Sequence, residues 1–539
     1  MVLLQFPDGK QICTEEGTMI AQMAYHQKDK DRIVGGILNG KVHDLNYRCT
    51  QSGHFEWIYQ DSVIGEMMTE RTLIFLFVTA VHQLLPEVDV SIEHSFASGL
   101  YGTLNRFDPF TEYECEQIRT RMQKMIDDKE IIYRRVVPTH EAITLFERQG
   151  MKDKARLLKH RTSQRSSIYT CAGLDDYFYG IMLPDASWIH QFTLIPYQGG
   201  FWLSTEKEFI DQPRLFEVYR QFEKRGRYNG VSTISQLNQK IEEGQLPEMI
   251  CANEKRVSDD LSDLADKILS HPDLKMILIA GPSSAGKTTF SRRLARELKN
   301  RGKHPMALSM DDFFLNRVES PKLPDGSYDY ENIDCLDLRL FNQCMTDLIA
   351  GKPVSLPTYN FVKGEKEFLK EPMTLKEEDI LILEGLHALN PRSSRSIPEQ
   401  NKFKIYINAL THLNLDSHNR ITTTDYRLIR RMTRDYQFRG KSVQDTLEGW
   451  ERVKDGEDRY IYPYQEMADI VFNTSMDYEL PVLKTILLPL LNAMDESCDE
   501  FIEANRIRKL LGYFADGDPS LVPHDSILSE FIGGSSFEE

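Results

Sequence analysis

The chain has 539 residues, of which 41% are hydrophobic and 27% charged, and its formal net charge is -17 at pH 7. This length predicts more than one domain, because domains usually contain roughly 100–200 residues, and the composition is typical of a folded protein. The acidic balance argues against broad, non-specific binding to nucleic acid or to anionic membranes.

The sequence shows no export or membrane signal. Its first residues, MVLLQFPDGKQ, lack the basic start and the apolar run of a signal peptide. The longest apolar run, residues 73–81, is shorter than the roughly 20 residues of a membrane span and predicts a buried helix. The eight cysteines have no Cys-x-x-Cys or zinc-finger spacing, which favours reduced thiols. We therefore expect a cytoplasmic protein without a membrane partner, and homo-oligomerisation stays open.

The first two predicted domains combine strands and helices. Residues 1–60 alternate apolar and polar positions, with turn signals at residues 7–9 and 39–40, which predicts a small β-rich module with hairpins. A helical pattern from about Ser62 to Leu85 is followed by short strands and by a charged helix over residues 114–129. This pattern predicts an α+β domain over residues 61–245.

The third predicted domain, residues 246–539, begins with a polar helix over residues 258–269. Apolar strands then alternate with helices, and the strands are predicted over residues 276–280, 306–310, 380–383, 403–407 and 470–472. Such alternation predicts a parallel sheet covered by helices. The expected fold class is therefore multidomain, with α+β domains followed by an α/β domain.

The first of these strands leads into a phosphate-binding loop. Residues 281–288 read GPSSAGKT and match G-x-x-x-x-G-K-[ST] between a strand and a helix, a context that disfavours a chance Gly/Ser turn. In such a loop the backbone N–H groups surround phosphate, Lys287 neutralises charge, and the Thr288 hydroxyl can ligate Mg²⁺. The predicted ATP-binding residues are Gly281, Ser283, Ser284, Ala285, Gly286, Lys287, Thr288 and Thr289. The Asn-Lys pair at residues 401–402 continues Phe-Lys, so a guanine-specific protein is disfavoured.

Two acids follow later strands of the predicted sheet. Asp311 follows the second strand, and Glu384 ends the third. Ligands of doubly wound sheets bind at the carboxyl ends of the strands, so these acids can accept a proton from an acceptor hydroxyl and hold Mg²⁺. The alternative is that such an acid caps a helix or lies solvated in a turn, and we prefer this interpretation for Asp312.

A later helix carries an arginine series. Arg427, Arg430 and Arg434 are spaced i, i+3 and i+7, which places their guanidinium groups along one helical face. Such a face can close over a transferring phosphate; the alternative is a solvated face paired with nearby acids. We assign Lys287, Arg430 and Arg434 to catalysis and Arg427 to substrate binding.

A series of motifs over residues 270–475 resembles, in its residues and their order, the uridine kinase and phosphoribulokinase family of P-loop kinases. The motifs are the loop, Ser309-x-Asp311-x-Phe-Phe, Tyr328-Asp329-Tyr330-Glu331, Leu356-Pro-Thr-Tyr359-Asn-Phe361, Leu383-Glu384-Gly385 and Arg427-x-x-Arg430-Arg431-x-x-Arg434-Asp435. The resemblance implies that Asp311 is the general base and that Thr288 and Glu384 hold Mg²⁺. It also implies that Asp329 binds a ribose hydroxyl and that Tyr359 and Phe314 wall the nucleoside pocket.

One segment departs from that family. Uridine kinases supply a histidine to the pyrimidine base from the segment after the Tyr-x-Phe motif, whereas residues 362–365 read VKGE here. The identity of the base is therefore open.

The first half resembles the front of threonyl-tRNA synthetase. Leu4-Gln-Phe-Pro-Asp-Gly9 and Gly36-Ile-Leu-Asn-Gly40 are similar to its TGS module, a β-grasp-like unit. Ala80-Val-His-Gln-Leu-Leu-Pro86, Ser98-Gly-Leu-Tyr101 and His140-Glu141-Ala142 are similar to its editing domain. The four positions of that family's editing site are Arg71, Phe75, Cys171 and Asp175 here, so only the cysteine remains. This implies a catalytically degenerate editing domain over residues 61–245.

A basic segment, residues 152–165, has six Lys or Arg residues and one acid, Asp153. It could contact RNA phosphates, but without interleaved aromatic residues we prefer a solvated helix face. The leading hypothesis is an ATP- and Mg²⁺-dependent kinase that phosphorylates the 5′-hydroxyl of a nucleoside such as uridine or cytidine. The alternatives are a phosphoribulokinase-like sugar-phosphate kinase and an RNA-binding regulatory ATPase.

Overall fold

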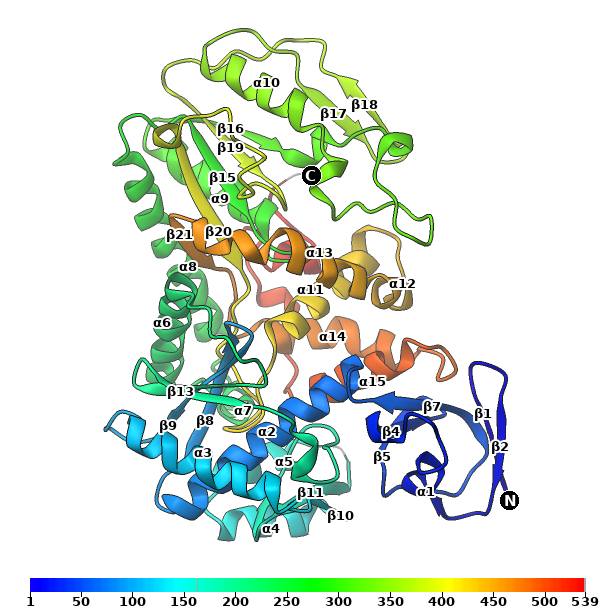
Figure 1. Cartoon of the computed structure of the whole chain (residues 1–539). Coiled ribbons are helices and arrows are strands. Elements are labelled where there is room, and N and C mark those ends of the chain that lie inside the picture. Colours follow the sequence, from blue (N-terminus) through cyan, green and yellow to red (C-terminus); the bar gives the residue numbers. More distant parts are fainter. Residues whose placement is uncertain (162, 538–539) are drawn as a thin grey trace.

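The computed structural model describes residues 1–161 and 163–537, and Figure 1 shows its elements. The N-terminal part is a small sheet with one short helix: β1 (Val2–Gln5), β2 (Gln11–Thr14), β3 (Thr18–Met19), α1 (Ile20–Ala24), β4 (Ile33–Leu38), β5 (Lys41–Asp44), β6 (Arg48–Cys49) and β7 (Gly53–Tyr59). Its main sheet has the strand order β2-β1-β7-β4-β5. Val2 and Leu4 of β1 are buried and alternate with exposed neighbours, as the period-two pattern predicted.

The second part contains two antiparallel sheets and a long buried helix. Its elements are α2 (Val63–Leu84), β8 (Val90–Phe96), β9 (Gly99–Leu104), α3 (Glu112–Asp127), β10 (Tyr133–Pro138), α4 (Thr139–Arg148), α5 (Lys152–Lys159), β11 (Arg165–Cys171), β12 (Leu174–Asp176), β13 (Thr193–Tyr197), β14 (Gly200–Ser204), α6 (Pro213–Asn229) and α7 (Ile234–Glu242). The sheets have the orders β10-β11-β12 and β13-β14-β9-β8. The predicted helix from Ser62 is confirmed, since Ser62 caps α2 by accepting the N–H of Gly65.

The third part is built around a parallel sheet. Its elements are α8 (Leu246–Leu269), β15 (Met276–Ala280), α9 (Lys287–Asn300), β16 (His304–Ser309), α10 (Leu338–Ile349), β17 (Pro357–Asn360), β18 (Glu365–Phe368), β19 (Asp379–Glu384), β20 (Lys402–Asn408), α11 (Thr423–Phe438), α12 (Val443–Glu448), α13 (Trp450–Tyr460), β21 (Ile470–Asn473), α14 (Glu479–Asn492), α15 (Phe501–Leu511) and α16 (Ser529–Ile532). The sheet order is β16-β19-β15-β20-β21, with every neighbouring pair parallel. The five predicted strands are confirmed, whereas α8 is a full helix from Leu246 rather than the shorter helix expected.

The last helices connect the three parts. In Figure 1, α14 and α15 lie between the parallel-sheet part and the N-terminal sheet. One buried apolar cluster extends from Ala142 in α4 to Phe531 in α16 and includes the core of α9 and α11. The second and third parts therefore share a core, because these helices bury apolar faces against both.

No helix in the described part of the chain is long and apolar enough to cross a membrane. The apolar residues 73–81 lie in α2, where all nine side chains are buried. The prediction of a buried helix for this run is confirmed.

Candidate active site

The carboxyl ends of three neighbouring strands converge on the phosphate loop. Glu384, the last residue of β19, is in register with Ser309 at the end of β16 and with Ile279 in β15. Asp311 follows β16 in a short 3-10 turn, Met310–Phe313, which starts where the Ser309 hydroxyl accepts the N–H of Asp311. Both predicted acids therefore stand at the edge of the sheet where the loop begins.

The loop geometry depends on two glycines. Gly286 has a φ of 86°, in the left-handed region, and directly precedes α9. A Cβ at Gly281 would lie 2.3 Å from the carbonyl oxygen of Ile407, so the loop approaches β20 too closely for a side chain. The Lys287 ammonium donates to the carbonyl oxygens of Gly281 (3.0 Å) and Pro282 (3.2 Å), and thus lies across the loop.

Buried charges gather around Lys287. Burial lowers the pKa of Lys287, although the carboxylates of Glu384 and Asp311 favour its charged form. Burial raises the pKa of Glu384 to about 7; Asp311 and Glu530 add to this shift, whereas Lys287 opposes it. Burial also raises the pKa of Asp311, again opposed by Lys287. Perturbed acids beside a phosphate loop are characteristic of a site for proton and phosphate chemistry.

The acidic excess at this edge fits a divalent cation. Thr288 and Glu384 offer the oxygen donors that Mg²⁺ prefers, and Mg²⁺ is commonly held by one or two carboxylates together with substrate phosphates. Within residues 1–161 and 163–537, no group of three or more His, Cys, Asp or Glu side chains could hold a metal by itself. The residues present therefore suit a cation that arrives with a phosphorylated substrate.

The arginines of α11 face the loop, but two of them are paired with buried acids. Arg427 forms a bidentate pair with Glu457 at 2.6 and 2.7 Å and donates to the carbonyl oxygen of Ser283 (3.0 Å). Arg430 pairs with Glu479 at 2.5 and 2.7 Å. Both arginines are 0% exposed. Acids from α13 and α14 therefore neutralise both guanidinium groups behind the loop, and the assignments of Arg430 to catalysis and of Arg427 to substrate binding stay predictions.

The next two arginines of α11 are aimed at the loop side chains. Arg431 donates to the Ser283 hydroxyl at 2.6 Å, and Arg434 donates to the Ser284 hydroxyl at 3.2 Å. Burial lowers the pKa of Arg434 to about 10, only partly offset by nearby acids. An incompletely neutralised guanidinium is suited to phosphate. Arg431 was not selected from the sequence, although it lies inside the quoted arginine motif.

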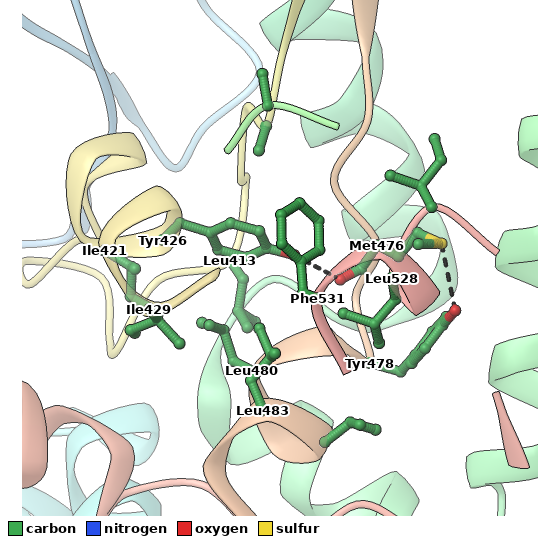
Figure 2. Packing of buried hydrophobic residues seen from close by; sticks show 14 of the residues in the cluster. Leu413, Ile421, Tyr426, Ile429, Met476, Tyr478, Leu480, Leu483, Leu528 and Phe531 are labelled. Carbon is green, nitrogen blue, oxygen red and sulfur yellow. Dashed lines mark hydrogen bonds between the residues drawn. The ribbon is translucent and has the colours of Figure 1, made fainter. Parts of the chain in front are cut away.

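The C-terminal segment, residues 519–537, reaches the same loop. Glu530 accepts from the N–H (3.3 Å) and the hydroxyl (3.0 Å) of Thr289, and lies 3.4 Å from Arg434. Figure 2 shows Leu528 and Phe531 of this segment packed among residues of α11 and α14. Glu530 thus presents a carboxylate to the first turn of α9, where a phosphate would be favoured. No local sequence signal could have indicated a contact across 241 residues.

Aromatic side chains form a wall beside Asp311. The rings of Phe314 and Tyr359 are 5.6 Å apart, edge to face, and the Tyr359 hydroxyl is buried without a partner in the described chain. Asp312 accepts the N–H of Tyr359 (3.2 Å) and the hydroxyl of Thr358 (3.3 Å), so it holds the β17–β18 hairpin in place. Asp312 thus has a structural role, but as a contact to a hairpin rather than as the predicted capping or solvated turn acid.

Two further buried residues on which the charge of Lys287 acts were not selected from the sequence. Burial raises the pKa of Glu331 to about 7, and Lys287 and Asp311 are among the charges that act on it. His387 is buried and neither ring nitrogen makes a hydrogen bond within the described chain. Burial lowers the pKa of His387 to about 4, and the nearby Glu331 backbone offsets this effect only in part. By contrast, the carboxylate of Asp329 accepts only from Asn332 (3.3 Å) among the residues that the structure describes.

The four editing-site positions of the second part do not form a common donor set. Arg71 donates to the carbonyl oxygen of Ile181 (3.1 Å), and Asp175 is paired with Arg135 (2.6 Å). Phe75 and Cys171 are fully buried, and burial raises the pKa of Cys171 to about 12. A buried neutral thiol of this kind is unreactive and suits a structural role for Cys171.

The basic segment, residues 152–165, is not a uniformly solvated face. Lys154 is 1% exposed, and its ammonium lies 2.7 Å from Asp176 and 3.1 Å from Asp416. Lys159 forms an exposed pair with Glu147 at 3.0 Å. The prediction is therefore wrong for Lys154, because it neutralises two buried acids that lie far away in the sequence. Thr162 is outside the described residues.

The model of the Phosphoribulokinase / Uridine kinase family matches residues 276–480. The chain is 29% identical over 208 residues to "Uridine-cytidine kinase B" of Dictyostelium discoideum, covering 38% of this chain and 76% of that protein. It is 28% identical over 220 residues to "Uridine kinase" of Lactobacillus helveticus, covering 40% of this chain and 95% of that protein.

A relative of another kind is also similar. "Threonine--tRNA ligase" of Pelobacter propionicus is 27% identical over 208 residues, which make up 38% of this chain and 33% of that protein. The chain therefore spans about a third of that relative's length.

Proposed function

We propose that the chain is an ATP- and Mg²⁺-dependent kinase that phosphorylates the 5′-hydroxyl of a nucleoside. The proposal starts from the C-terminal region, which carries a P-loop kinase domain of the phosphoribulokinase/uridine kinase family. The observation that carries this proposal is the convergence of Lys287, Asp311 and Glu384 beside an aromatic wall. Uridine and cytidine are the first candidates, since two relatives are named uridine or uridine-cytidine kinases.

The proposed chemistry follows from the positions of the charges. The Asp311 carboxylate accepts the proton of the acceptor hydroxyl, whose oxygen forms a bond to the γ-phosphorus while the bond to the β–γ bridging oxygen breaks and ADP leaves. Lys287, Arg431 and Arg434 stabilise the charge on the phosphates. Thr288 and Glu384 would hold Mg²⁺, which neutralises phosphate charge when bound. The remaining loop positions, from Gly281 to Thr289, bind ATP through the backbone and hydroxyl groups.

The acceptor would lie against the wall formed by Phe314 and Tyr359, with Asp329 or Glu331 on its ribose. Because residues 362–365 read VKGE and offer no histidine to the base, the base would be recognised mainly by shape and stacking. A site that hydrogen-bonds a polar edge can reject analogues lacking it by about 10⁴, whereas shape alone discriminates roughly 10–200-fold. We expect loss of a ribose hydroxyl to lower kcat/KM more than exchange of one base for another.

ADP release by the full chain tests the proposal against its alternatives. The acceptors are uridine, cytidine, inosine, guanosine, their deoxy forms and ribulose 5-phosphate, with Lys287→Ala as the inactive control. Stimulation by a ribonucleoside supports the proposal. Stimulation only by ribulose 5-phosphate would identify a sugar-phosphate kinase, and RNA-stimulated hydrolysis without an acceptor would identify a regulatory ATPase.

For the first half, the similarity to a threonine–tRNA ligase supports a TGS-like module over residues 1–60 and an editing-like domain over residues 61–245. This domain is proposed to be inactive, because Arg71 and Asp175 are engaged elsewhere and Cys171 is a buried thiol. Incubating the chain with seryl-tRNA should release no serine above the protein-free rate. Release that depends on the protein and is lost in Cys171→Ala would overturn this assignment.

A further inference from the structure

A cavity of about 820 Å³ lies where the three parts of the chain meet, away from the phosphate loop. Its wall combines the start of β5, the first turns of α2, the segment after β12, and α14 with α15. The volume is within the roughly 300–1,000 Å³ of small-molecule sites. The cavity is therefore large enough for a compact ligand that touches all three parts.

The wall of the cavity is strongly cationic. Three of its cations have acidic partners: Arg134 pairs with Asp44, Lys484 with Asp516, and Arg506 with Asp425 and Glu503. Among the described residues that line the cavity, Glu503 is the one acid, and it is already paired with Arg506. The cations without an acid within 4.0 Å in the described chain are Lys41, Arg71, Arg161, Arg508 and Lys509.

These unpaired cations repel one another. The pKa of Lys509 is lowered by burial and by the charges of Arg161, Arg508, Lys41 and Arg134. The pKa of Arg71 is also lowered, by burial and by Arg506. Clustered cations destabilise the folded state unless an anion neutralises them. The geometry thus provides a site whose charge is unbalanced without a ligand.

Aromatic side chains supply the remainder of the wall. Tyr177, Phe178, Tyr179 and Tyr513 line the cavity. The hydroxyls of Tyr177 and Tyr513 are hydrogen-bonded to each other, and Tyr179 donates to the backbone of Arg506, so these rings are held in place. Fixed rings beside cations suit a planar base that carries phosphate.

We propose that this cavity binds a free nucleotide, with its phosphates on Lys509, Arg161 and Arg71, as a second nucleotide site independent of the phosphate loop. Of the four editing-site positions only Arg71 lines the cavity; Phe75, Cys171 and Asp175 are absent from its described wall. The site therefore differs from a retained hydrolytic centre, and it stands whether or not the kinase proposal holds.

Thermal unfolding in a Lys287→Ala background isolates this site, because nucleotide binding at the phosphate loop is then weakened. ATP and GTP should raise the Tm of the Lys287→Ala chain. They should not raise it when Lys509→Ala and Arg161→Ala are added. Without ligand, Lys509→Ala should match or exceed the parent Tm, since it removes repulsion; a folding defect would instead lower it. Lys267→Ala, an exposed lysine of α8, is the matched control and should keep the full shift.

Equilibrium dialysis with labelled ATP gives the second readout. Wild type should bind two nucleotides per chain, and Lys509→Ala should weaken one site at least about tenfold while sparing the other. Equal binding by wild type and Lys509→Ala overturns the proposal. If inorganic pyrophosphate raises the Tm as much as ATP does, the aromatic rings do not contribute to binding. Binding of tRNA without binding of free nucleotides overturns the choice of a free ligand.

Discussion

At the scale of single residues, burial decides which acids can do chemistry. Asp311 and Asp312 are sequence neighbours, yet only Asp311 is acted on by the charge of Lys287. Asp312 is bonded to the backbone of Tyr359 and to the hydroxyl of Thr358. The two carboxylates are thus a matched pair, one facing the loop and one holding a hairpin.

Asp311→Asn is expected to lower kcat by about 10²–10⁴-fold, the usual contribution of a positioned general base. ATP affinity should stay within a few-fold, because the phosphates do not depend on this carboxylate. Steady-state kinetics with the best acceptor measure both values. Asp312→Asn is the control and should keep kcat within a few-fold; an unchanged kcat in Asp311→Asn would return Asp311 to a structural role.

A second residue pair allows a test of how the stability of the fold depends on pH. His94 Nδ1 lies 2.5 Å from Glu223 Oε1, and both are buried. Burial lowers the pKa of His94 from 6.5 to about 3 and raises that of Glu223 from 4.5 to about 7. Between pH 4.5 and 6.5 the folded pair holds one proton, and the unfolded chain also holds one, on the histidine. The pair therefore adds little slope to stability in wild type.

Glu223→Gln should expose the histidine's own slope. Below pH 6.5 the unfolded histidine gains a proton that the buried ring does not, so the free energy of unfolding falls as pH drops, by up to about 1.4 kcal/mol per pH unit. His94→Gln should do the reverse, losing stability as pH rises from 4.5 to about 7. Glu93 and Arg420 also act on His94, and Arg227 and His412 act on Glu223; neither variant substitutes any of these four residues. Urea unfolding at pH 5, 6 and 7 measures both; parallel curves for the two variants would contradict the shared proton.

At the scale of elements, the C-terminal segment is joined to the phosphate loop by charge and by packing. A Cβ at Gly286 would lie 2.6 Å from Ile527, and the Arg430 guanidinium lies 4.9 Å from the centre of the Phe531 ring. Glu530 places a negative charge at the first turn of α9, where the proposed ATP site would hold phosphate. If the chain binds ATP there, the nucleotide competes with this carboxylate.

Glu530→Gln is expected to lower the KM for ATP by about tenfold, because the like charge is removed while the shape is kept. ATP titrations at low and high salt measure the effect, which should shrink as salt screens it. Asp525→Asn is the control, since that acid pairs with Arg296 on the surface of the same segment. A higher KM in Glu530→Gln would mean that the carboxylate supports ATP binding instead.

At the scale of the whole molecule, buried polar contacts tie the second part to the third. Lys154 neutralises Asp176 and Asp416, and His418 contacts Asp176 at 2.6 Å. Asn414 donates to the backbone of Ile92 at 3.0 Å. The parts should therefore unfold together rather than independently.

Lys154→Ala is expected to cost about 3–5 kcal/mol, since it leaves two buried acids without their cation. Calorimetry should show a lower Tm for one common transition. Lys159→Ala is the matched control in the same helix, because its exposed pair with Glu147 is worth less than about 1 kcal/mol. Two separate transitions in wild type, only one of them shifted by Lys154→Ala, would contradict a joint core.

The sequence by itself determined the local parts of this protein. Strand β15 and the start of α2 are predicted within a residue, because apolar periodicity and capping act over a few neighbours. The phosphate loop and the strand-end acids Asp311 and Glu384 are also local, since each motif is read within one short segment. These residues could therefore be selected before the fold was known.

Only the tertiary structure decided which distant surfaces meet. Arg430 is neutralised by Glu479, Glu530 reaches Thr289, and Lys154 is buried between two acids. The cationic cavity likewise exists only where three parts come together. Such contacts depend on how the packed elements are placed, and the sequence between two partners does not indicate that they meet. The physical reason is that the energy of a charge is set by what surrounds it in space rather than by its sequence neighbours.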